Sequence, residues 1–255
     1  MVFEMWSFWH FLYMLSPFLF IALLYFVGKR VNERVRDVIS LVLGILSFAV
    51  LITRNVDIYV RCGVDLEIIP LQVCHVGNIV TGLALTLKKR WLLITSFCFN
   101  MIPAYLAMIF ADSLANYSTL LAIRPQSYIW GHILIVVTAV WGIMVYKPKP
   151  TRRDAILSLS LVSGILVTAI TANSALRLIE GWEPNYFYLY NYKGTPLKFL
   201  YEPFPTLNIG WFSINPVYVL VLVVVFLAVY FALLRLIKLY AKHQKPDVSS
   251  ENKPK

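Results

Sequence analysis

The sequence is poor in charged residues, which make up only 14% of its 255 positions, whereas 59% are apolar. It contains no polar tract long enough to form a separate water-soluble domain, so we expect a single folded unit. Only three cysteines are present, an odd number without paired spacing, which favours neither a disulfide framework nor a zinc site. No internal repeat is visible. The sequence therefore indicates no metal and no cofactor.

Long apolar runs are what the chain has in abundance. A transmembrane helix needs roughly 20 predominantly apolar residues. Seven stretches approach this length, of which the second is short: 6–27, 38–52, 68–87, 91–110, 127–146, 155–176 and 214–237. The sequence therefore predicts an all-α, polytopic transmembrane helix bundle of about seven helices over residues 1–241. A short disordered cytoplasmic tail, rich in Lys, Pro and Ser, is expected at 242–255.

Basic residues are distributed unevenly between the loops. Of the 23 Lys and Arg residues, 17 follow the first, third, fifth and seventh stretches. Because Lys and Arg accumulate in cytoplasmic loops, the N-terminus is predicted outside and the C-terminus in the cytoplasm. The formal charge of +10 is then explained by topology and by attraction to anionic lipid at the cytoplasmic face. We expect no nucleic-acid partner.

A few polar side chains interrupt the apolar stretches at one level. Counting 1.5 Å per residue from the predicted outer ends places His10, Cys74, His75 and His132 at similar depths. Asn78 shares a helix face with Cys74, four residues earlier. Polar groups in lipid are costly, which favours a polar pocket opening to the outer leaflet. In the alternative interpretation, the thiol is a small hydrophobe and the histidines are hydrogen-bonded packing residues.

The connection between the last two stretches is the second unusual region. Residues 177–212 exceed the usual length of a loop and are densely aromatic. They include Asn185, Tyr186 and Tyr188, which we expect to bind a ligand if this segment is a lid over the pocket. An aromatic belt at the headgroup level is the alternative.

Several short motifs resemble a known family. They are IPLQVC at residues 69–74, GHIL at 131–134 and PNYFYL at 184–189. The chain resembles the YwaF family of bacterial integral membrane proteins, which is similar to the eukaryotic transmembrane protein 164, described as a cysteine-dependent phospholipid acyltransferase. The resemblance implies membrane lipids as partners and a bacterial cell membrane as location. The family commonly carries a histidine where this chain has Gln72, so a catalytic base would have to be His75 or His132.

Three functions follow from these observations. In the first, Cys74 is the nucleophile of an acyl transfer, His132 is the general base, and Asn78 or Asn185 donates to the oxyanion. His10, His75, Asn78, Asn185, Tyr186 and Tyr188 are the expected binding residues. In the second, the same pocket belongs to a lipid or small-solute transporter. In the third, the polar residues only join the helices of a non-catalytic accessory membrane subunit. The sequence does not indicate an oligomeric state.

Overall fold

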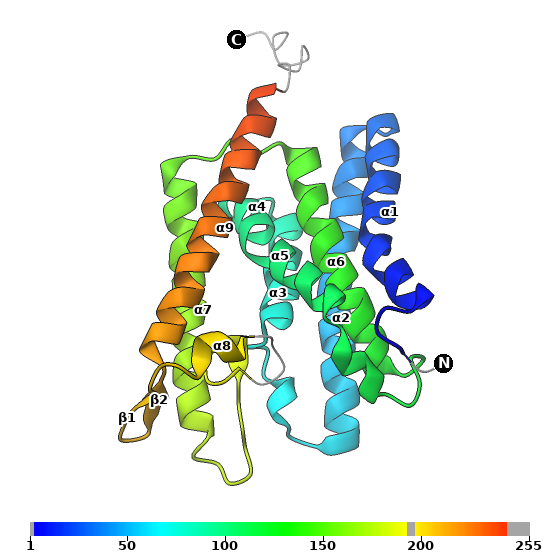
Figure 1. Cartoon of the computed structure of the whole chain (residues 1–255). Coiled ribbons are helices and arrows are strands. Elements are labelled where there is room, and N and C mark those ends of the chain that lie inside the picture. The colour runs from blue at the N-terminus through cyan, green and yellow to red at the C-terminus, as the bar shows by residue number, and fades with distance from the viewer. Residues whose placement is uncertain (1–2, 193–196, 244–255) are drawn as a thin grey trace.

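Seven helical segments, each long and apolar enough to cross a membrane, form most of the fold (Figure 1). They are seen in a computed structural model that describes residues 3–192 and 197–243. The elements in chain order are α1 Phe8–Arg30, α2 Glu33–Cys62, η1 Leu66–Ile68, α3 Val73–Leu87, α4 Arg90–Thr95, η2 Ser96–Asn100, α5 Met101–Ile109, η3 Asp112–Asn116, α6 Ile123–Tyr146, α7 Arg152–Leu176, η4 Tyr186–Tyr188, α8 Lys198–Tyr201, β1 Leu207–Ile209, β2 Phe212–Ile214 and α9 Pro216–His243. The predicted bundle of seven spans is confirmed, with η1 and α3 in the third span and α4, η2 and α5 in the fourth.

The second span is much longer than its apolar run predicts. The sequence predicts residues 38–52, whereas α2 has 30 residues. Its polar ends are helical because they find partners. Asn32 caps the first turn by accepting the amide hydrogen of Val35, and Arg61 pairs with Asp57 in the last turns. The prediction of a short second span is therefore wrong, since an apolar run measures only the part of a helix that contacts hydrocarbon.

Prolines determine where the third and fourth spans depart from a regular α-helix. The third was predicted to run without a break from residue 68, but the chain turns at Pro70 and α3 begins at Val73. In the fourth span, the π-helical turn η2 precedes Pro103, whose ring nitrogen has no hydrogen to donate. As a consequence, Cys74 lies in the first turn of α3. The prediction that it lies two turns inside a helix is wrong.

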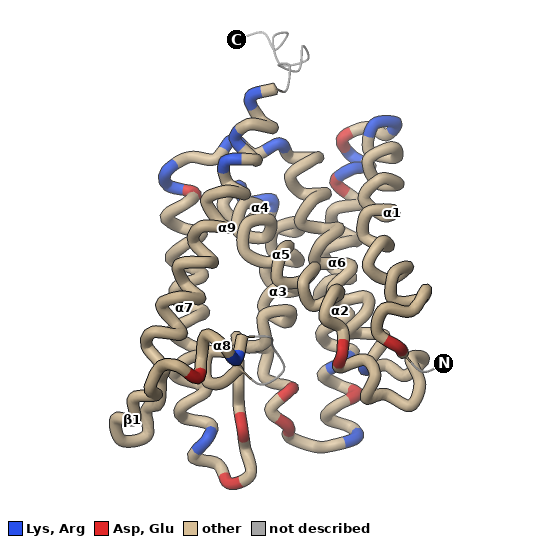
Figure 2. The backbone as a smooth tube through the Cα atoms, in the orientation of Figure 1, with Lys and Arg blue, Asp and Glu red and all other residues tan. Residues whose placement is uncertain are grey.

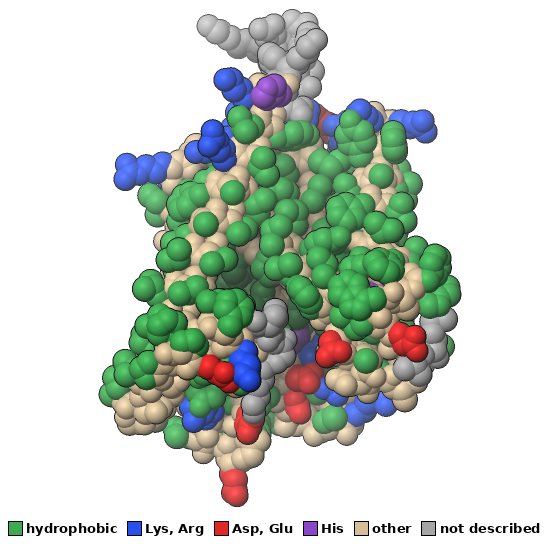
Figure 3. Space-filling view, in the orientation of Figure 1, with side chains coloured by type: hydrophobic (Ala, Val, Ile, Leu, Met, Phe, Trp, Pro, Cys, Tyr) green, Lys and Arg blue, Asp and Glu red, His purple; other side chains and the backbone are tan. Residues whose placement is uncertain are grey.

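Helix α6 lies at the centre of the bundle and contacts α1, α2, α3, α4 and α5. Helix α2 packs closely on α3 at two glycines: a Cβ on Gly44 would come within 3.1 Å of the Gly82 carbonyl oxygen, and a Cβ on Gly82 within 2.7 Å of the Phe48 ring. Helix α7 contacts α4, and α9 contacts η2. Apolar side chains cover the wall of the molecule between its two charged ends, as expected of a surface in contact with lipid (Figure 3).

Lys and Arg gather at the end of the bundle where α9 finishes, here called the basic end (Figure 2). There Arg90 pairs with Asp154 at 2.7 Å, and Asp154 also completes a capping box with Thr151. The hydrogen bond to Asp37 raises the pKa of Lys88. The first described residues lie toward the opposite end, as an odd number of spans requires (Figure 1). The assignment of the basic end to the cytoplasm stays a prediction.

The last helix is longer than the apolar run that predicts it. Residues 214–237 were expected to be helical, and α9 extends to His243. The predicted tail at 242–255 therefore overlaps the last turn of α9, since Lys242 and His243 are helical. Residues 244–255 lie outside the described part of the chain.

The described part of the connection between α7 and α9 is folded against the end opposite the basic end (Figure 1). Asn173 of α7 fixes η4 with two hydrogen bonds: its Nδ2 donates to the Tyr186 carbonyl at 3.0 Å, and its Oδ1 accepts the Tyr186 amide hydrogen at 2.7 Å. Further along, β1 and β2 pair antiparallel, with Leu207 opposite Ile214. These contacts place η4 next to the polar residues of the bundle interior.

Candidate functional site

Cys74 occupies the N-terminal turn of α3. The first amide hydrogens of an α-helix have no acceptor within the helix, and the side chain of the N-cap residue, Gln72, makes no capping hydrogen bond. The N-terminal end of a helix also carries a partial positive charge. Helix α3 therefore presents the Cys74 thiol beside amide hydrogens that can bind an oxyanion.

His132 lies in the middle of α6 and is almost fully buried, with 3% of its surface exposed. Its Nδ1 is 2.7 Å from the Tyr128 carbonyl oxygen. A carbonyl oxygen can only accept, so the neutral imidazole carries its proton on Nδ1 and its lone pair on Nε2. The Tyr128 hydroxyl donates to the Ala107 carbonyl at 2.7 Å and so fixes the turn that holds the imidazole. His132 is thus oriented as a proton acceptor.

Two adjacent cavities meet at Cys74 and His132. The first, of about 550 Å³, is lined by apolar residues of α5 and by a few polar side chains, among them Asn100, Asp112 and Asn116, and is here called the apolar cavity. The second, of about 450 Å³, is lined by charged and amide side chains and is here called the polar cavity. Figure 3 shows the wall hollowed between α9 and α5, beside the helix that lines the apolar cavity. Six residues line both cavities: Gln72, Cys74, Ser113, Tyr128, His132 and Tyr188.

His75 and Asn78 both line the polar cavity. Both are buried, and neither the Nδ1 atom of His75 nor the Oδ1 atom of Asn78 has a hydrogen-bond partner among the described residues. Asn78 Nδ2 donates to the Cys74 carbonyl oxygen at 3.0 Å. One hydrogen of this amide therefore serves the helix, and its role toward an oxyanion stays a prediction.

The aromatic connection contributes two of its three expected residues to the cavities. Tyr188 lines both cavities and Asn185 lines the polar one. The Asn185 amide donates to Asn191, so it stabilises its own turn. Tyr186 lines neither cavity. Burial raises the pKa of Tyr186 to about 12, and its neutral hydroxyl donates to the Leu66 carbonyl at 2.9 Å, which anchors η4 to η1.

His10 is not part of this site. Its Nδ1 accepts the Trp6 amide hydrogen at 2.9 Å, so its Nε2 carries the proton and donates to the Met108 carbonyl at 2.9 Å. It is fully buried and does not line the apolar or the polar cavity. The sequence grouped His10 with the other histidines because of its similar depth. That grouping is wrong, since the His10 side chain instead joins the start of α1 to α5.

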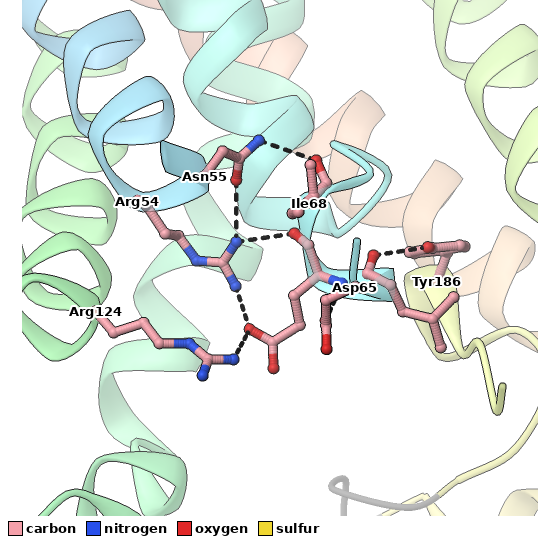
Figure 4. Close-up of polar contacts among 8 residues, drawn as sticks. Arg54, Asn55, Asp65, Ile68, Arg124 and Tyr186 are labelled. Carbon is pink, nitrogen blue, oxygen red and sulfur yellow. Dashed lines mark hydrogen bonds and ion pairs between the residues drawn. The ribbon is translucent and has the colours of Figure 1, made fainter. Parts of the chain in front are cut away.

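A charged cluster in the polar cavity was not recognised in the sequence. Arg54 of α2 and Arg124 of α6 both point toward the Glu67 carboxylate, and all three residues line the cavity (Figure 4). Arg54 also donates to the Glu67 carbonyl oxygen at 2.9 Å, and Asn55 donates to the Ile68 carbonyl at 2.9 Å. In the sequence these residues appear only as charges near the ends of predicted spans, a distribution that membrane topology explains equally well.

The cysteines and histidines are not arranged around a metal. Among the described residues, no three His, Cys, Asp or Glu side chains lie close enough together to hold a metal ion. The three cysteines are free thiols: Cys62 is exposed, Cys74 is partly buried, and Cys98 is buried outside both cavities.

Comparison with known proteins gives one match. The model of the TMEM164 family matches residues 5–234, which include most of each of the seven spans. The chain belongs to the TMEM164 family. No curated protein and no solved structure matches it. Membership of the TMEM164 family and seven apolar spans make this an integral, multi-pass membrane protein.

Proposed function

We propose that the protein transfers acyl groups between membrane lipids, with Cys74 as the nucleophile and His132 as the general base. The observation that carries this proposal is the place of the two side chains, which both line an apolar cavity and a polar one. A lipid ester has an acyl chain on one side of its carbonyl carbon and a polar headgroup on the other. The junction of the two cavities therefore suits the carbonyl carbon.

In the first half of the reaction, the Cys74 sulfur attacks the ester carbonyl of a donor lipid and its proton moves to Nε2 of His132. The oxyanion that forms is stabilised by the free amide hydrogens at the start of α3. When the carbon–oxygen bond breaks, His132 returns the proton to the leaving alkoxide, and a lysolipid departs. The acyl chain is left on Cys74 as a thioester.

In the second half, the hydroxyl of an acceptor lipid attacks the thioester carbonyl. His132 takes the hydroxyl proton, and the thiolate of Cys74 leaves and receives that proton back. The enzyme returns to its starting state, and no water, metal or redox step is needed. His132 acts once as base and once as acid in each half, as general acid–base catalysis requires.

The proposal is tested with the full chain in lipid nanodiscs that contain a phospholipid with an isotope-labelled acyl chain and an unlabelled lysolipid acceptor. We expect label transfer to the acceptor and a labelled thioester on the peptide that contains Cys74, identified by mass spectrometry. Cys74→Ser should abolish both, while His132→Ala should slow transfer by about 10²- to 10⁴-fold, the usual contribution of a positioned base. The matched control is Cys98→Ser, which removes a buried thiol outside both cavities.

Thiol labelling gives a second measurement. In a Cys62→Ser background, which removes the exposed thiol, a lipid-soluble alkylating reagent should modify Cys74 faster than Cys98. His132→Ala should slow the reaction of Cys74 alone. Equal and slow labelling of the two thiols, with transfer retained by a folded Cys74→Ser variant, would rule out a thioester mechanism.

A lipid carrier is the second candidate, because an apolar cavity beside a polar one also suits a lipid that is bound without reaction. A carrier should move labelled lipid between vesicles and should retain this activity in the Cys74→Ser variant. We also propose that the protein resides in a bacterial cell membrane and that its basic end binds anionic lipid. Both are tested by fractionation and by binding to vesicles with and without anionic lipid.

A further inference from the structure

We propose that Arg54 and Arg124 form a binding site for the phosphate group of a membrane phospholipid, and that the Glu67 carboxylate occupies this site when no lipid is bound. The inference deepens the proposed acyl transfer, on which it rests, by assigning the headgroup end of the substrate to named residues. The site lies in the polar cavity, whose wall also contains Cys74.

The two guanidinium groups converge on a single point. Nη2 of Arg54 and Nη2 of Arg124 contact the same oxygen of Glu67, Oε2, at 2.5 and 2.7 Å. One tetrahedral phosphate group can therefore contact both, because its oxygens lie as close together as those of a carboxylate. Planar guanidinium groups are well suited to phosphate, which they bind with paired hydrogen bonds.

The two arginines are held in different ways. Nη1 of Arg54 donates to the Glu67 carbonyl oxygen and to Asn55, so this side chain is fixed before any ligand arrives. Arg124 is bound through one nitrogen, and its Nε is buried without a hydrogen-bond partner among the described residues. A buried donor without a partner is costly, and a second phosphate oxygen would satisfy it.

Glu67 is suited to give way to a ligand. Its side chain is 44% exposed, whereas those of Arg54 and Arg124 are 16% and 28% exposed. The carboxylate can therefore turn outward into water while the arginines stay in the cavity wall. Glu183 also lines the cavity, so its two arginines are balanced by two carboxylates. The site therefore selects a phosphate by direct contact with the guanidinium groups and not by the net charge of the cavity.

The site is tested by binding, in the Cys74→Ser protein, so that no acyl transfer is needed for the result. The full chain in a non-ionic detergent is titrated with dihexanoylphosphatidylcholine and with dihexanoylglycerol, which has the same acyl chains but no phosphate. We expect the phospholipid to bind roughly ten- to hundredfold more tightly. Arg124→Gln should remove most of this difference, Arg124→Lys should retain part of it, and Glu67→Gln should tighten phospholipid binding.

Arg61→Ala is the matched control, because Arg61 lies at the same end of α2, pairs with Asp57 and does not line the polar cavity. It should bind both lipids as the parent does. Glycerophosphocholine and inorganic phosphate distinguish a lipid from a soluble phosphate, and both should compete weakly. Equal affinity for the two lipids, a folded Arg124→Gln variant with unchanged preference, or soluble phosphate that competes as well as the lipid would overturn the proposal. Phosphate-dependent binding, combined with a parent protein that retains Cys74 but shows no transfer activity, would instead refute the acyl-transfer proposal and leave this site standing.

Discussion

The two hydrogen bonds between Asn173 and Tyr186 provide a sharp test of how the aromatic connection is held. Asn173 is 2% exposed, and its side-chain amide satisfies both the amide hydrogen and the carbonyl oxygen of Tyr186. Asn173→Ala leaves the buried amide hydrogen of Tyr186 without a partner, which costs about 1 to 3 kcal/mol, while the Tyr186 carbonyl oxygen keeps the hydrogen bond from the Leu189 amide at 3.2 Å. We therefore expect a destabilisation of about 1 to 3 kcal/mol, which is above the effect of most surface substitutions.

The effect is measured by unfolding the purified protein in mixed micelles with increasing sodium dodecyl sulfate, followed by tryptophan fluorescence. Thr171→Ala is the matched control, because Thr171 lies on the same helix but is exposed and bonds only to its own helix. Asn173→Ala should also lower the proposed acyl transfer, since η4 carries Tyr188 to both cavities. An Asn173→Ala variant within 0.5 kcal/mol of the Thr171→Ala control, the usual range for surface substitutions, would refute this account.

Two further predictions concern helix packing and topology. Gly44→Ala should destabilise the bundle by about 1 to 3 kcal/mol, because its Cβ would lie 3.1 Å from the Gly82 carbonyl oxygen. Gly164→Ala is the control in the same unfolding assay: its Cβ would have no neighbouring side chain within 4 Å, so it should be neutral or slightly stabilising. A reporter fused after the basic end should be cytoplasmic and one fused at the N-terminus external, and finding both on one side would contradict the predicted orientation.

The seven spans could be predicted from the sequence because an apolar run of the right length leaves a chain few alternatives in lipid. Their ends could not, because capping and ion pairs decide them. Asn32 and the Asp57–Arg61 pair lengthen α2 beyond its apolar run, and the turn at Pro70 shortens α3. The later start of α3 shortens the helix by only a few residues, but it places Cys74 in the first turn, where the backbone amide hydrogens have no acceptor within the helix.

The candidate site could be predicted only in part, because depth in a membrane says nothing about which helices are neighbours. Cys74 and His132 share their depth and also their cavities. His10 shares the depth alone, since its imidazole is bound to the Met108 carbonyl of α5. Arg54 and Arg124 lie on spans far apart in the sequence, so only the folded chain brings them to one carboxylate.

The structure also bears on which histidine would serve as the general base. Because Gln72 stands where the family commonly carries a histidine, the candidates are His75 and His132. His75 lines only the polar cavity, and its imidazole is hydrogen-bonded to the backbone of Ile69. His132 lines both cavities, and the Tyr128 carbonyl holds its proton on Nδ1. A general base has to lie within reach of the proton that it takes, and Cys74 lines both cavities, as His132 does. We therefore infer that His132 takes the proton of Cys74 and that Gln72, which lines both cavities beside the thiol, contacts the substrate without titrating.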